Sequence, residues 1–162
     1  MKAFLLILCL PLLSSCATAI ISGPAASYES KRFEEIFELP NQSKEDLYVK
    51  VNSWMVETFN SAESVIEFSD KEAGKVLGKY TFVFTDKIYF YQIKQNIEIS
   101  VKENKVKLEI KNPTYRTTMD MRVGFVNSSS PLETQAGIDR AKIEWNTLSE
   151  SLLAFLRKKS NW

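Results

Sequence analysis

Polar and apolar residues alternate along the middle of the chain. The clearest case runs from Ile88 to Lys102, where apolar side chains take nearly every odd position and polar side chains most even ones. A period of two is typical of a strand with one face in the core and the other in solvent. The same alternation in shorter segments predicts further strands at 31–39, 64–68, 75–84 and 106–110.

Two other segments repeat their apolar residues every three to four positions, which is typical of an amphipathic helix. The first, 44–60, follows Ser43 and has Asp46 at its third position, in a variant of the capping box. The second, 138–156, ends in basic residues that suit the C-terminal end of the helix dipole. The apolar stripes consist of Leu47, Val51, Trp54, Met55 and Phe59, and of Ile138, Ala141, Trp145, Leu148, Leu152 and Phe155.

The order strand, helix, four strands, helix predicts a single α+β domain over residues 31–160. The short turn at 103–104 sets a hairpin register that pairs Val101 with Val106. Since one sheet face is apolar and the other polar, we expect one curved antiparallel sheet with both helices on its apolar face. Residues 112–137 follow neither period, and we expect a long loop there.

The N-terminus carries an export signal. Lys2 precedes an apolar stretch that ends in Leu13-Ser14-Ser15-Cys16, the pattern of a bacterial lipobox. It predicts a signal peptide at 1–15, a lipidated Cys16 and a flexible tether at 16–30. The body would then lie outside the cytoplasm, in the bacterial cell envelope, and Ala17 after the cysteine favours the outer membrane over the inner one.

Two other interpretations of this segment stay open. Ala17-Thr18-Ala19 is an A-x-A pattern, after which an ordinary signal peptidase could cut. The segment could also remain as an uncleaved membrane anchor, because no charged residue lies between Lys2 and Glu29. All three interpretations export the domain.

Composition argues against several classes of function. Removal of Lys2 leaves as many basic as acidic residues, whereas nucleic-acid binders usually carry a positive excess, so no nucleic-acid partner is expected. The chain has no histidine, the commonest general base and metal ligand. Its cysteines are Cys9, in the signal peptide, and Cys16. We therefore expect no cofactor, no metal and no catalytic residue.

Four side chains are candidates for a binding site: Phe90, Lys94, Arg116 and Arg122. Lys94 belongs to the polar sheet face, for which two interpretations stay open: a weakly basic platform for an anionic envelope component, or a solvated surface. Phe90 could dock a partner or be covered by the 112–137 loop. Arg116 and Arg122 lie in that loop and could bind a carboxylate or phosphate, or form local ion pairs.

These features favour a lipid-anchored binding or scaffolding module. Its partners would be the membrane, through the lipid on Cys16, and an envelope protein, glycan or lipid. Two alternatives are a carrier that holds a small apolar ligand between sheet and helices, and an enzyme of unrecognised type that uses the 112–137 loop.

The first two thirds of the chain carry three short motifs: Lys44, Leu47 and Tyr48, then Trp54, then Asp70, Gly74, Val76 and Gly78. In order and spacing they resemble a family of uncharacterised bacterial lipoproteins, common in Bacteroidetes. The resemblance spans Phe33 to Ile110. It implies a TATA-binding-protein-like fold and an envelope setting, but no activity, and the name of the fold does not imply DNA binding.

Overall fold

The alternating segments pair into one antiparallel sheet with the strand order β1-β5-β4-β3-β2, and a short β6 pairs with β5. The computed structural model describes residues 23–59 and 65–158, so the predicted signal peptide and Cys16 lie outside the described residues. The elements are η1 (Glu29–Lys31), β1 (Phe33–Glu38), α1 (Lys44–Thr58), β2 (Val65–Asp70), β3 (Lys75–Asp86), β4 (Tyr89–Lys102), β5 (Lys105–Thr118), β6 (Ser130–Pro131) and α2 (Gln135–Arg157).

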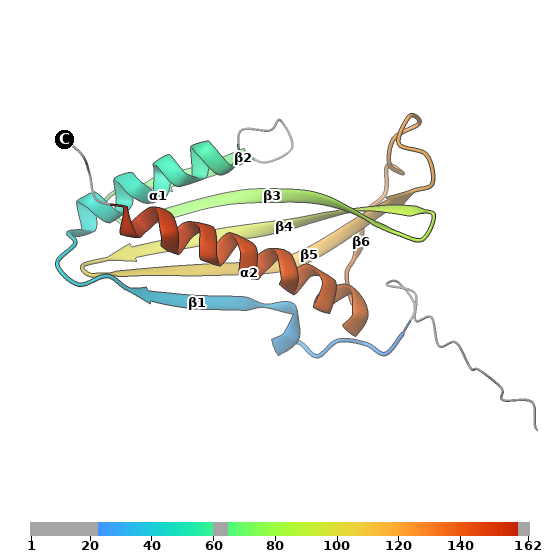
Figure 1. Ribbon diagram of the computed structural model, residues 1–162, viewed down its shortest axis with the longest axis horizontal. Coiled ribbons are helices and arrows are strands. Elements are labelled where there is room, and N and C mark those ends of the chain that lie inside the picture. Colours follow the sequence, from blue (N-terminus) through green and yellow to red (C-terminus); the bar gives the residue numbers. More distant parts are fainter. Residues whose placement is uncertain (1–22, 60–64, 159–162) are drawn as a thin grey trace, which may run out of the picture.

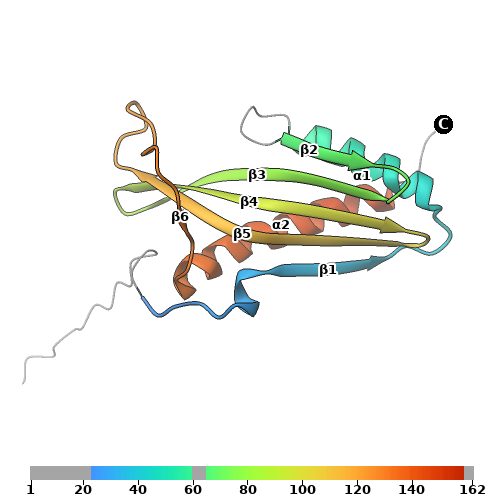
Figure 2. The ribbon, with the colours of Figure 1, turned by 180° about the vertical axis from the view of Figure 1, so that it is seen from behind.

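Both helices, α1 and α2, lie on one face of this sheet (Figure 1), and no helix of the described residues covers the opposite face (Figure 2). The predicted α+β class and layer order are confirmed. Ser43 caps α1, since its Oγ accepts the Asp46 N–H at 3.1 Å. Thr134 caps α2 in the same way, accepting the Gly137 N–H at 3.2 Å, so α2 begins three residues before the predicted Ile138. Among the described helices, none is long and apolar enough to cross a membrane.

The core fills the space between the helices and the sheet. Val101 pairs with Val106, as predicted, and both are buried. Trp54 of α1 and Trp145 of α2 are fully buried against the strands. The position expected for an apolar ligand, between sheet and helices, is thus occupied by side chains of the chain itself.

The predicted 112–137 loop is shorter in the structure, because β5 continues to Thr118. Its register against β4 shifts by one residue: Asn96 pairs with Lys111, but Lys94 pairs with Thr114. Such a bulge inserts an extra residue and reverses which side chains face the core. Asn112, at the bulge, has a positive φ of 56°. The alternation of apolar and polar residues in the sequence is therefore interrupted at Asn112, although β5 continues through the bulge to Thr118.

The predicted tether also differs from the structure at its C-terminal end. The Ala26 N–H donates to the Glu133 carbonyl at 2.6 Å, and the Gln135 N–H donates to the Pro24 carbonyl at 2.9 Å. The small side chain of Ala26 is buried against the core. Residues 24–30 therefore belong to the folded domain, and a free tether can extend only over residues before Gly23.

Candidate functional site

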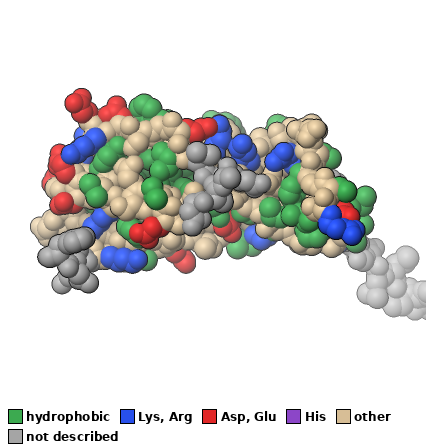
Figure 3. All heavy atoms as spheres, turned by 90° about the horizontal axis from the view of Figure 1, so that it is seen from above, with side chains coloured by type: hydrophobic (Ala, Val, Ile, Leu, Met, Phe, Trp, Pro, Cys, Tyr) green, Lys and Arg blue, Asp and Glu red, His purple; other side chains and the backbone are tan. Residues whose placement is uncertain are grey.

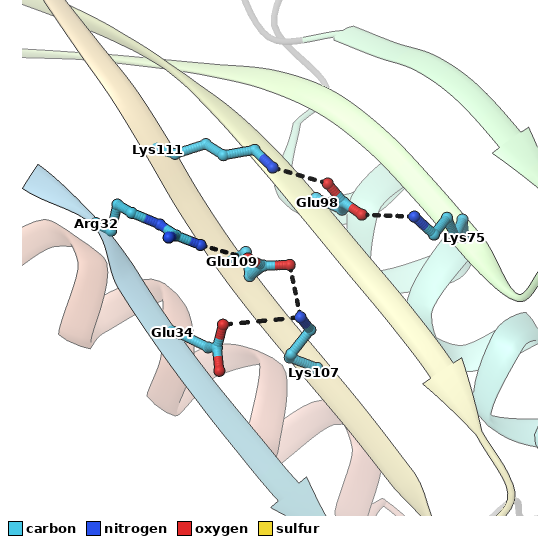
Figure 4. Close-up of polar contacts among 7 residues, drawn as sticks. All are labelled: Arg32, Glu34, Lys75, Glu98, Lys107, Glu109 and Lys111. Carbon is cyan, nitrogen blue, oxygen red and sulfur yellow. Dashed lines mark hydrogen bonds and ion pairs between the residues drawn. The ribbon is translucent and has the colours of Figure 1, made fainter. Parts of the chain in front are cut away.

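The face of the sheet without helices carries rows of charged residues that neutralise one another (Figure 4). Glu98 on β4 lies between two ammonium groups, 2.9 Å from Lys75 and 2.9 Å from Lys111. Glu109 on β5 lies 2.8 Å from Lys107 and 3.2 Å from the guanidinium of Arg32. Lys75 and Lys111 reach Glu98 from the two neighbouring strands, whereas Lys107 lies two residues before Glu109 on β5 itself.

The ion pairs keep both carboxylates charged. Hydrogen bonds from Lys111 and Lys75 hold the pKa of Glu98 below its ordinary value, and the hydrogen bond from Lys107 does the same for the pKa of Glu109. Lys79, on the same face of the sheet, pairs with Glu67. The central part of this face therefore offers little net positive charge to a ligand.

Lys94 and Arg116 differ from those cations. Of the described residues, none supplies a carboxylate within ion-pair distance of either side chain. Arg116 sits opposite Gln92 in the β4–β5 register, and its Nε donates to Gln92 Oε1 at 2.9 Å. Its guanidinium carbon also lies 5.9 Å from the centre of the Phe125 ring. Arg116 is thus held in place by a neutral amide and an aromatic ring, with its charge uncompensated.

These two cations line one small polar hollow of about 160 Å³, which we call the Lys94–Arg116 hollow. Strands β4 and β5 form its floor, and the segment between β5 and β6 forms its rim. Amide, hydroxyl and cationic groups in one concave site suit an anionic or hydroxyl-rich ligand. The lining residues are Gln92, Lys94, Thr114, Tyr115, Arg116, Asn127 and Ser129.

The other two sequence candidates do not line this hollow. Arg122 forms a local ion pair, with its Nη2 2.8 Å from Oδ2 of Asp120 and its Nε 3.0 Å from Oδ1. The Arg122 guanidinium lowers the pKa of Asp120 in turn. Phe90 pairs with Thr118 at the end of the sheet and is half-buried.

A larger hollow of about 600 Å³ lies where η1 meets β5 and β6. It contains three cations, but each has a carboxylate partner: Lys31 pairs with Glu133, Arg32 with Glu109 and Lys111 with Glu98. An incoming anion would have to displace a carboxylate already in place, so this hollow is the weaker candidate. In the described part of the chain, no group of three or more Asp, Glu or Cys side chains could hold a metal ion.

Exposed apolar side chains gather at one end of the molecule, where the β3–β4 turn meets the loop after β5. We call this set the apolar tip: Val83, Ile88, Tyr89, Met119, Met121, Val123 and Val126, all exposed. The sequence directed attention to the neighbouring Phe90 as a docking residue, but not to Met119, Met121 or Val123. Their signal was a short alternation in which Met119, Met121 and Val123 are separated by Asp120 and Arg122, although the structure forms no strand there.

Comparison with known proteins places the fold in a family without an assigned activity. The model of a domain of unknown function (DUF4468) with TBP-like fold matches residues 33–116. Among curated proteins, none matches the chain. A crystal structure of a DUF4468 family protein from Bacteroides ovatus is 14% identical, with a TM-score of 0.63, over 88% of this chain and 96% of that one. A TBP-like protein from Parabacteroides distasonis is 13% identical, with a TM-score of 0.60, over 79% of this chain and 96% of that one.

Proposed function

This chain belongs to the DUF4468 family of TBP-like domains, and from that premise we propose that it is a lipid-anchored, extracytoplasmic binding module. Its ligand would be an anionic group, a phosphate or carboxylate, carried by a component of the cell envelope. The Lys94–Arg116 hollow would bind this group.

The uncompensated charge of Lys94 and Arg116 is the observation on which the binding role rests. The lysines of the central ion-pair rows already have carboxylate partners, which a ligand would have to replace. Arg116 instead keeps its charge available while Gln92 and Phe125 orient it. A group fixed before binding loses less conformational entropy when the ligand arrives. An anion in the hollow would therefore gain charge-assisted hydrogen bonds at low cost.

The lipobox supports the envelope setting. Acylation of Cys16 would hold the protein on a membrane, because several acyl chains anchor a protein stably. The domain would then meet only ligands exposed at that surface, such as lipid head groups and anionic polymers.

We expect the Cys16→Ala variant to accumulate as a full-length precursor, because the lipobox peptidase acts on the acylated cysteine. Intact-mass spectrometry of the membrane-extracted wild-type protein should give a chain that begins at Cys16 and carries acyl groups. A wild-type mass that begins at Met1, or at Ile20 without fatty acid, would contradict the proposal. Normal processing of the variant would contradict it as well.

We expect the Lys94→Gln variant to bind glycerol phosphate about tenfold more weakly than the wild type, since a hydrogen bond to a charged group contributes about 1.5–3 kcal/mol. The measurement is an NMR titration of the mature protein in a nonionic detergent. Acetate serves as the carboxylate probe in a parallel titration.

The matched control is Lys102→Gln. Lys102 lies on the same strand and the same sheet face, is exposed, and loses the same charge, but it lies eight residues away, at the last position of β4. Equal weakening by both variants would indicate a nonspecific charge effect and would refute a site at the hollow. Absence of binding to both probes would refute it too.

A further inference from the structure

The apolar tip has several large hydrophobic side chains exposed in two neighbouring loops, where polar residues would be expected. Ile88 at the β3–β4 turn is 64% exposed, and Met119 and Val123 in the loop after β5 are 63% and 79% exposed. In Figure 3, hydrophobic side chains gather at the end of the molecule drawn on the right. The loop around them also frames an apolar hollow of about 500 Å³. Clustered exposed apolar side chains of this kind mark an interaction surface.

The chain enters the domain at this same end. The segment that opens the described chain lies beside the start of α2, through the bridge between Ala25 and Thr134. In Figure 1 this blue segment, the β3–β4 turn and the loop after β5 all lie at the right-hand end. The β4–β5 turn and the C-terminal end of α2 lie at the opposite end. The residues before Gly23 therefore join the body on the side of the apolar tip.

The length of that connection limits how far the body can stand from an anchor on Cys16. Six residues separate Cys16 from Gly23. Even fully extended, this segment spans at most about 25 Å, which is less than the length of β4 at roughly 3.4 Å per residue. An anchor at Cys16 would thus keep this end of the domain next to the bilayer.

We propose that the apolar tip docks into the interfacial layer of the membrane to which the protein is anchored. This inference rests on the lipid anchor of the proposed function and adds an orientation. The apolar tip faces the membrane, and the long axis of the sheet extends outward from it. Ile88, Met119 and Val123 enter the boundary between head groups and acyl chains. Lys87, exposed beside Ile88 in the turn, stays among the head groups.

The lipid anchor allows the few side chains of the apolar tip to hold the domain against the membrane. A tip of a few side chains would bind a bilayer only weakly as a free domain. Tethered by a short segment, it meets the surface at a high effective concentration, and docking becomes an intramolecular step. The β3–β4 turn and the loop after β5 lie at the same end of the sheet, so both can reach one interface (Figure 1).

A single fluorophore can test the orientation. Cys16 is the only cysteine after the signal peptide and its sulfur carries the lipid, so one introduced cysteine can be labelled selectively. Val123→Cys and Lys71→Cys, both at exposed positions, would carry the dye NBD at the tip and at the opposite end. The acylated proteins are reconstituted in vesicles of phosphatidylethanolamine and phosphatidylglycerol.

We expect lipids with nitroxides on the acyl chains to quench more than half of the emission at position 123 and to leave that at position 71 nearly unchanged. Equal, weak quenching at both positions in protein whose mass confirms acylation would overturn the docking and leave the anchor intact. A blue-shifted but unquenched signal at position 123 would show contact with a second copy, and would also overturn it. A mass without acyl groups would refute the proposed anchor, and the docking with it.

Discussion

Replacing Trp145 by alanine should lower the free energy of unfolding by about 3–5 kcal/mol, the usual range for removing a large aromatic side chain from a core. Trp145 is fully buried in the middle of α2, and its ring lies 6.0 Å from that of Phe33 on β1. The side chain thus joins the helix to the edge strand. Urea unfolding followed by circular dichroism gives the measurement. Ile143→Ala, on the same helix but 60% exposed, is the control and should change the free energy by less than about 0.5 kcal/mol.

Part of that loss comes from a buried hydrogen bond. Trp145 Nε1 donates to Gln95 Oε1 at 2.6 Å, and Gln95 is itself buried on the helix-covered face of β4. Nε2 of Gln95 has no hydrogen-bond partner among the described residues. Trp145→Phe alone leaves the whole amide unsatisfied, whereas adding Gln95→Leu removes the polar group and should recover stability. If the double variant is no more stable than Trp145→Phe, the hydrogen bond does not explain the loss.

The sequence predicted those parts of the fold that depend on a regular period. The hairpin that pairs Val101 with Val106 follows directly from alternation on both sides of a short turn. The cap at Ser43 follows from one residue type at one position. Such features are local, because a strand or helix displays its own buried face in its own sequence.

Features that depend on a distant partner did not follow from the sequence. The bulge opposite Gln95 reverses which side chains of β5 face the core, so the sequence pattern predicts a loop where the strand continues to Thr118. Gln95 occupies a core position because the Trp145 indole, fifty residues away, supplies its partner. The same limit applies to the site. Lys94 looks like any lysine of the polar face until the ion pairs around its neighbours are known.

The family motif at Gly74 leads to the second large effect. Gly74 ends the β2–β3 turn with a φ of 65°, a left-handed conformation that costs other residues about 1–2 kcal/mol. A Cβ at this position would lie 2.4 Å from the carbonyl oxygen of Val101, which is backbone and cannot rotate away. The Val101 N–H also donates to the Gly74 carbonyl at 2.7 Å, so the two segments cannot simply separate. We expect Gly74→Ala to destabilise the protein by about 2 kcal/mol or more, measured by urea unfolding.

The variant Gly124→Ala separates the effect of backbone strain from the effect of the clash with the Val101 carbonyl. Gly124 has a similar φ of 76°, but a Cβ there would meet nothing within 4 Å. This variant should therefore show only the backbone strain, about 1–2 kcal/mol, and Gly74→Ala should exceed it by the cost of the clash. If both variants lower the free energy of unfolding equally, the backbone at Val101 moves to accommodate the Cβ. The close approach of the two backbones would then not explain the glycine at position 74.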